Sequence, residues 1–168
     1  LSISINIFAQ DLPKLELKQT GIESIVVDVE GKTASELYNQ ALNWVQETYK
    51  NPDEVLKAKI ENQKIRINGF SENSWYIKSL GMKQYSDLSY SIEISFKDGK
   101  YKFEYAITKL SKDGQKFGYS YPYFFKKDGS TRKFYKESVP AINNEMNDLS
   151  QSFYDYEVGK TDKKEDDW

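Results

Sequence analysis

The sequence predicts an α+β fold in which two amphipathic helices pack on one face of an antiparallel β-sheet, a meander. Three observations predict it: a capped helical pattern after Thr33, a second helical pattern after Ser138, and an Asp-Gly dipeptide at Asp98-Gly99 that joins two alternating strands. The chain has 168 residues, which is within the range of one domain and enough to bury a core without disulfides.

Residues 1–10 form an apolar run that ends with a small residue, Ala9, as the last part of an export signal does. The alternation of apolar and polar residues from Leu1 to Ile7 is equally typical of a half-buried strand. The first interpretation predicts an exported protein, periplasmic or secreted. Residues 11–21 contain Pro13, charges and a glycine, and we expect a short extended leader before a single domain at 22–158.

The first strand and the first helix have the clearest local signals. A β-branched run over residues 22–29 ends at Gly31 and predicts a strand. Thr33 and Glu36 have the spacing of a capping box, and the helix they begin ends at Asn51-Pro52. The apolar stripe that this helix presents to the core consists of Leu37, Ala41, Trp44, Val45 and Thr48.

The next region alternates more weakly. We expect a strand at 54–60, a turn at 61–63, and a second strand with Ile65 and Ile67 inward that ends near Gly69-Phe70. Residues 72–86 mix aromatic, glycine and polar residues, and we expect a loop with a short helix over the edge of the core.

The hairpin at Asp98-Gly99 has a predictable register because this dipeptide tolerates the positive φ angles of a two-residue turn. The pairs that this turn predicts, with all apolar members on one face, are Phe96 with Tyr101, Ile94 with Phe103, Ile92 with Tyr105, and Tyr90 with Ile107. Lys-Asp-Gly recurs at 112–114 and 127–129. The repeat predicts strands at 88–97, 100–111, 116–126 and 131–136, with Pro122 favouring an edge position or an interruption in the third.

A second helix is predicted after Ser138, which we expect to be its cap, with Pro140 in the first turn. Its apolar positions recur at spacings of three and four, so it should pack on the sheet beside the first helix; they are Val139, Ile142, Met146, Leu149 and Phe153. Residues 159–168 form a charged segment without apolar periodicity, and we expect a disordered tail.

Composition excludes many kinds of site. Without cysteine the chain has no disulfide, thiolate metal site or cysteine nucleophile, and without histidine it lacks the commonest general base and metal ligand. We therefore expect no metal, no cofactor and no enzymatic activity; the alternative is an enzyme that uses only Asp, Glu, Tyr or Lys. The net charge is −2, and no apolar run is long enough for a transmembrane helix.

Several of these segments together resemble a known family. The segments 31–41 (with Trp44 after them), 51–55 and 96–103 are similar to the exported bacterial family known as domain of unknown function number 4468, described as having a TATA-binding-protein-like (TBP-like) fold. The resemblance covers about residues 22 to 110, and the long 112–137 segment departs from the family pattern. It implies a β-α-β(4–5)-α order, with helices on one face of a curved sheet and the other face open, and it supplies no catalytic residue.

Aromatic residues around Pro122 are the candidate binding residues. They cannot all point inward from one strand, so we expect a surface for a protein, glycan or lipid, formed by Tyr119, Tyr121, Tyr123, Phe124 and Phe125. Lysines and aromatic residues also alternate over 97–136, as in single-strand nucleic-acid binding, but alternation places rings in the core and lysines in solvent. The sequence thus predicts an exported, non-enzymatic binding module of the bacterial cell envelope, whose exposed sheet face or aromatic segment contacts its partner. A nucleic-acid-binding domain that uses the basic 97–136 segment is an alternative. No nucleic-acid partner is expected.

Overall fold

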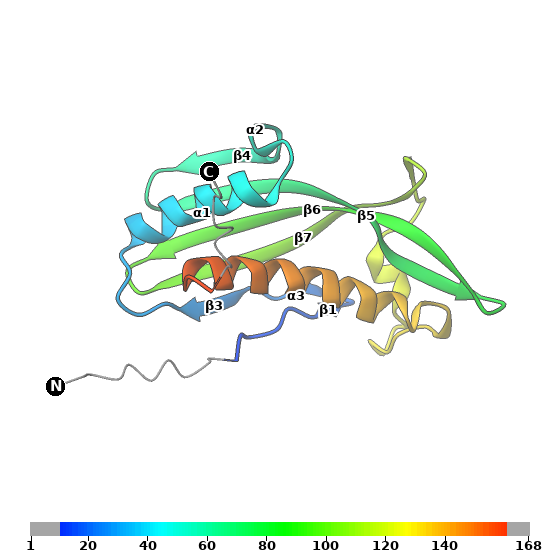
Figure 1. Cartoon of the computed structure of the whole chain (residues 1–168). Helices are drawn as coiled ribbons and strands as arrows, with labels where there is room; N and C mark the ends of the chain where they lie inside the picture. The colour runs from blue at the N-terminus through cyan, green and yellow to red at the C-terminus, as the bar shows by residue number, and fades with distance from the viewer. Residues whose placement is uncertain (1–10, 161–168) are drawn as a thin grey trace.

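A computed structural model describes residues 11–160 (Figure 1). Its main sheet is antiparallel, with the strand order β3-β7-β6-β5-β4 and β8 paired to the end of β7. The α+β class is confirmed, and two long helices lie across one side of the sheet, as predicted (Figure 1). The strands are β1 (Leu17–Lys18), β2 (Gly21–Ile22), β3 (Ile25–Asp28), β4 (Leu56–Ile60), β5 (Lys64–Ser79), β6 (Met82–Lys97), β7 (Lys100–Lys112) and β8 (Gln115–Lys116). The helices are α1 (Ala34–Thr48), the single turn α2 (Pro52–Val55) and α3 (Ser138–Glu157), with 3-10 turns η1 (Tyr121–Phe124) and η2 (Lys133–Tyr135).

Helix α1 begins with the predicted capping box. The Glu36 backbone N–H donates to the Thr33 hydroxyl at 3.2 Å, and the Thr33 N–H donates to the Glu36 carboxylate at 2.8 Å. The Asp98 carboxylate accepts from the Ala34 N–H at 2.8 Å, so the hairpin turn caps the same helix. Its predicted stripe is buried apart from Thr48, which is exposed.

The predicted register of the β6–β7 hairpin is confirmed at all four pairs. Ile92, Ile94 and Phe103 are fully buried against the helices. A shift of one residue would have turned Glu93 and Glu104 into this core, so the sequence allows only this register.

The prediction of a loop and helix at 72–86 is wrong. β5 continues to Ser79, beyond the predicted end near Gly69-Phe70, and β6 returns from Met82. A β-bulge between Ser71 and Trp75 interrupts the pairing and therefore hides the two-residue period. The strand expected at 54–60 also begins later, at Leu56, because the preceding residues form α2.

The predicted third and fourth strands of the meander are also wrong. After the two residues of β8 the chain forms η1 and η2, with one isolated bridge between Phe125 and Thr131. Pro122 lies within η1, where its missing N–H costs no ladder bond. Aromatic side chains of this segment turn inward onto Trp75 instead of pairing as a sheet.

Helix α3 packs beside α1, as predicted, with the Trp44 and Phe153 rings 5.2 Å apart. Ser138 is not its cap: Ser138 is the first helical residue, and its hydroxyl donates to the Tyr76 carbonyl at 2.7 Å. Burial of Ser138 explains the difference, because its hydroxyl needs a partner on the sheet and finds one in β5.

The extended 11–21 segment is fixed to α3. Leu15 and Leu17 are buried, and their N–H groups donate to the Asn147 and Asn143 side chains at 2.9 and 2.8 Å. The predicted export signal at 1–10 and the tail from residue 161 lie outside the described residues. In the described part of the chain, no helix is both long and apolar enough to cross a membrane.

Candidate functional site

The aromatic segment predicted as a binding site is divided between core and surface. Phe124 is fully buried, its ring 5.3 Å from Trp75 and stacked at 4.3 Å on Tyr135, and Phe125 is 5% exposed. These two rings therefore hold the segment against the core beside Trp75 and are not free to contact a ligand.

The outer part of the same segment is accessible. Tyr119 and Tyr121 are half-buried, and Tyr123 is 54% exposed with its ring 5.3 Å from that of Tyr119. The Arg132 guanidinium lies 5.1 Å above the Tyr123 ring, and its Nε donates to the Tyr123 carbonyl at 2.9 Å. We call Tyr119, Tyr121, Tyr123 and the neighbouring exposed Phe134 the aromatic surface.

The sheet face away from α1 and α3, which we call the open face, carries a second candidate site. A hollow of about 600 Å³ lies on it, between the end of β2 and strand β5. The residues around this hollow are mostly small or charged: Ile22, Glu23, Ser24, Arg66, Ser91, Glu93, Glu104, Tyr105 and Ala106. The hollow is therefore a shallow depression with mostly polar walls.

Charges cross the floor of the hollow in one row. Glu93 on β6 is directly opposite Arg66 on β5 and Glu104 on β7. Lys64 contacts Glu93 at 2.6 Å and Lys102 contacts Glu104 at 2.7 Å, so both carboxylates are neutralised by lysines. Arg66 has no ion-pair partner within residues 11–160, and its guanidinium is left facing solvent.

Apolar side chains are exposed around this charged row. Val26, Ile60 and Phe70 are 54%, 51% and 59% exposed. Each is paired with an outward residue of the neighbouring strand, Lys102, Lys64 or Ser89, so all three lie on the open face. The sequence predicted the exposed sheet face as a possible contact surface but indicated no particular residue on it. The alternation of β5 could have indicated Arg66, because this residue lies between the inward-facing Ile65 and Ile67 and must therefore point to the open face.

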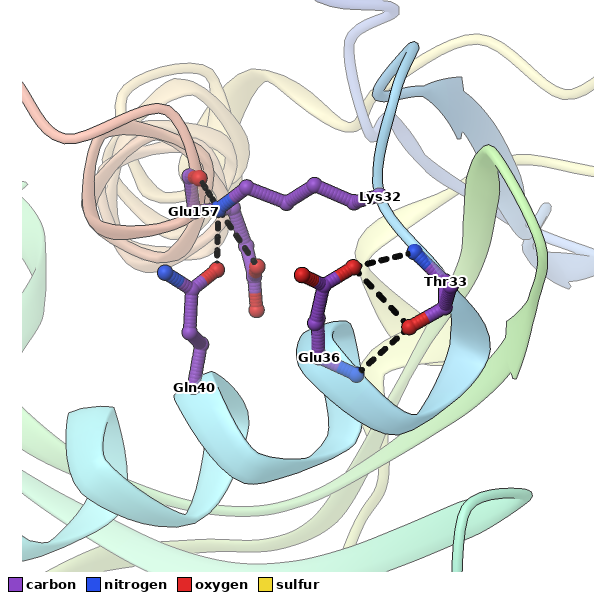
Figure 2. A network of polar contacts seen from close by, with 5 residues as sticks. All are labelled: Lys32, Thr33, Glu36, Gln40 and Glu157. Carbon is purple, nitrogen blue, oxygen red and sulfur yellow. Dashed lines mark hydrogen bonds and ion pairs between the residues drawn. The ribbon is translucent and has the colours of Figure 1, made fainter.

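A buried polar network joins the ends of the two long helices (Figure 2). Lys32, in the loop before α1, donates to the Gln40 side chain and to the Glu157 carbonyl, and its Nζ lies 3.8 Å from the Glu157 carboxyl. Glu157 is fully buried, and its carboxyl oxygens have no hydrogen-bond partner in the described structure. Burial raises the pKa of Glu157 to about 8, although Lys32 acts in the opposite direction.

This network does not form an active site. A carboxyl with a raised pKa is a candidate general acid, but the fully buried Glu157 offers no path for a substrate. Within the described residues there is also no group of three or more acidic side chains positioned to hold a metal ion. The Lys32–Glu157 contact instead ties the last turn of α3 to the start of α1.

A group of tyrosines between the helices and the sheet is likewise structural. The Tyr49 and Tyr90 hydroxyls are hydrogen-bonded at 3.1 Å, and the Tyr90 ring stacks on Tyr105 at 5.1 Å. Burial raises the pKa of each of these three hydroxyls, so all stay neutral at physiological pH. Gly69 supports the group, since its missing Cβ leaves room for the Tyr90 ring.

Comparisons with known proteins agree with this architecture. The family model described as a domain of unknown function (DUF4468) with TBP-like fold matches residues 24–111, which confirms the resemblance predicted from the sequence. A TBP-like protein from Parabacteroides distasonis is similar in structure, with a TM-score of 0.63 and 16% identity over 81% of this chain and 91% of that one. A DUF4468 family protein from Bacteroides ovatus has a TM-score of 0.55 and 14% identity, covering 95% and 94%. No curated protein matches the chain.

Proposed function

The chain belongs to the DUF4468 family, with its TBP-like fold, and we propose that it is an exported, non-enzymatic binding module of the bacterial cell envelope. Its principal binding surface is the open face, and its partner is a protein. The observation that carries this proposal is the hollow in which Arg66 has no ion-pair partner among the described residues. Exposed Val26, Ile60 and Phe70 around it supply apolar contact area.

The chemistry of the hollow favours a partner with an acidic group. A guanidinium binds a carboxylate through two parallel hydrogen bonds, and Arg is enriched at the centres of protein interfaces. We therefore expect a side-chain or C-terminal carboxylate of the partner at Arg66. Small residues on the floor, Ser91 and Ala106, leave room for it.

The structure gives less support to the two alternative functions, nucleic-acid binding and catalysis by carboxyl groups. A nucleic acid needs several unpaired cations along its phosphates, and in the charged row of the open face Lys64 and Lys102 are already paired with Glu93 and Glu104, which leaves Arg66 alone. An enzyme built from carboxyl chemistry would need an accessible group of altered pKa, and Glu157 is fully buried. Neither alternative therefore has an observation in its favour.

Site-specific photo-crosslinking tests the open face. A photoreactive residue is placed at Ser91 or Ala106 in the hollow, and at exposed Asn39 on α1 as a control, and the native cells are irradiated. We expect a discrete adduct from the two hollow positions and none from Asn39. Arg66→Gln should reduce that adduct about tenfold, whereas the matched surface change Lys50→Gln should not. Equal adducts from hollow and control positions would refute the open face as the binding site.

The aromatic surface is a second candidate contact, with Tyr119, Tyr121 and Tyr123 as its ligand-binding residues. The half-exposed ring of Tyr123, held by Arg132, is suited to stack on a sugar ring or to pack against a protein. Tyr123→Ala should weaken retention on envelope glycans, while Phe125→Leu should keep it if the fold is intact. Unchanged retention by both variants would remove this surface from the proposal.

Location can be tested separately. Fractionation of the source cells should recover the native protein from the periplasm or the medium, since we propose export. Recovery in the cytosol alone would contradict it and would leave the open-face experiment unaffected.

A further inference from the structure

The β5–β6 hairpin extends well beyond the sheet. β7 pairs with β6 only from Asp87 onward, and β4 pairs with β5 only as far as Ile67. Residues 75–86 therefore pair only with each other and form a two-stranded ribbon, seen at the right of Figure 1. The Ser138 hydroxyl holds the ribbon at the Tyr76 carbonyl, Ile77 packs against the core, and Lys78 contacts Glu137. The part of the ribbon beyond these contacts is the last pair, Ser79 with Met82, and the turn that joins its strands.

The end of the ribbon is apolar where a turn is normally polar. Leu80 and Gly81 form the two-residue turn with φ angles of 50° and 80°. Asn, Asp or Gly is favoured at the position of Leu80, because a side chain with a Cβ and larger groups is strained there. Leu80 is nevertheless 95% exposed, and the adjacent Met82 is 65% exposed. The strained backbone at Leu80 and the exposed side chains of Leu80 and Met82 do not stabilise the folded monomer.

Behind this apolar end lies a collar of aromatic and basic residues. The Tyr76 and Tyr85 rings are 5.5 Å apart across the two strands, and Lys83 lies 4.3 Å above the Tyr76 ring. Lys78 is half-exposed on the opposite strand, 3.7 Å from Glu137 of the neighbouring segment. Between residues 76 and 85 there is no Asp or Glu, so the ribbon itself carries only positive charge.

We propose that this ribbon tip inserts into the surface of a lipid bilayer that contains anionic lipids. Leu80 and Met82 enter the acyl boundary, the two tyrosines lie at headgroup level, and Lys83 approaches the phosphates. Apolar side chains ahead of a Tyr and Lys collar follow the polarity gradient of a membrane interface. The positive charge of the ribbon complements an anionic headgroup layer, and a small apolar area gives weak, reversible attachment.

A labelling experiment measures insertion directly. The chain contains no cysteine, so Leu80→Cys gives a single site for an environment-sensitive NBD fluorophore. The matched control is Asn39→Cys, an exposed position on α1 that belongs to neither the open face nor the ribbon. With vesicles of 30% phosphatidylglycerol in phosphatidylcholine, NBD emission should rise severalfold at position 80 and stay constant at position 39. Vesicles of pure phosphatidylcholine should leave the emission at position 80 unchanged.

Sedimentation with the same vesicles measures how much each residue contributes. Lys83→Gln should lower the partition coefficient about fivefold, since one lysine near an anionic surface contributes about that factor. Leu80→Asn should lower it by a similar factor while keeping or raising the urea midpoint, because Asn tolerates the left-handed turn. A loss of partition in this variant therefore cannot come from unfolding.

Two results would overturn the inference. One is the absence of any NBD response at millimolar anionic lipid. The other is a response at position 80 to envelope protein extract and not to vesicles, which would assign the tip to a protein pocket. The open face takes no part in either measurement, so the proposed protein-binding function stands or fails separately.

Discussion

The buried carboxyl of Glu157 should govern how the stability of the fold depends on pH between 5 and 8. Burial raises its pKa from 4.5 in the unfolded chain to about 8 in the folded one. The folded state thus holds a proton that the unfolded state releases. Stability from this group is complete below about pH 4.5 and is lost as the pH rises towards 8.

The size of the effect follows from the same two values. A pKa rise from 4.5 to about 8 contributes a total of about 5 kcal/mol to the free energy of unfolding at low pH. This contribution falls by about 1.4 kcal/mol per pH unit between the two values. Ordinary Asp and Glu titrate near pH 4, and Tyr and Lys near pH 10, whereas histidine is absent from the chain. Few other groups therefore contribute to the slope.

Urea unfolding followed by tryptophan fluorescence at pH 5, 6, 7 and 8 provides the measurement. The wild-type free energy of unfolding should fall with pH, whereas that of Glu157→Gln should stay nearly level, because the amide does not ionise. Lys32 keeps its contacts with Gln40 and the backbone carbonyl in this variant. The exposed Glu47→Gln is the control and should retain the wild-type slope. Equal slopes for wild type and Glu157→Gln would refute the reasoning.

Two further predictions concern the packing of the fold. A Cβ at Gly69 would lie 2.2 Å from Cζ of Tyr90, whose ring is held by stacking and a hydrogen bond, so Gly69→Ala should cost about 1–3 kcal/mol in urea unfolding. Gly118→Ala, with open space around it, should change stability by less than about 0.5 kcal/mol, and equal losses would contradict the packing argument. Thr33→Ala removes the two hydrogen bonds of the Thr33 hydroxyl, with the Glu36 N–H and the Glu36 carboxylate, and should cost about 1 kcal/mol, or roughly 3 °C in the thermal midpoint. Calorimetry of Ser35→Ala provides its comparison, and a midpoint for Thr33→Ala as high as that of the control would count against the cap.

The parts of the fold that could be predicted depend on contacts between residues close in sequence. The capping box joins residues three apart, and the β6–β7 register follows from a two-residue turn and one apolar face. The parts that failed depend on distant contacts. Trp75 packs against Phe117 and Phe124, which lie more than 40 residues later in the chain, and no local sequence pattern predicts this packing. The bulge after Ser71 similarly breaks the strand pattern without a sequence signal of its own.

The candidate sites were predictable to different degrees for a related reason. Aromatic composition pointed to Tyr123, which is exposed, but could not distinguish it from Phe124, which is fully buried. The hollow at Arg66 depends on which lysine neutralises which glutamate across three strands. That outcome requires the register of β5 against β6, and the turn that sets this register, Leu80-Gly81, lies in the segment that the sequence predicted as a loop with a short helix.

The two sides of the sheet are subject to different constraints. On the helix side nearly every ring has a packing partner, so substitution there changes stability first and says little about binding. Arg66, Phe70 and Leu80 lie where folding does not require their identity: two are exposed apolar residues, and the third is a cation whose neighbours are already paired. Exposed residues contribute little to stability, so losses of binding on their substitution can be attributed to direct contacts. A position such as Gly69, which supports the tyrosine group, should show the reverse pattern, with binding lost only as far as the fold is lost.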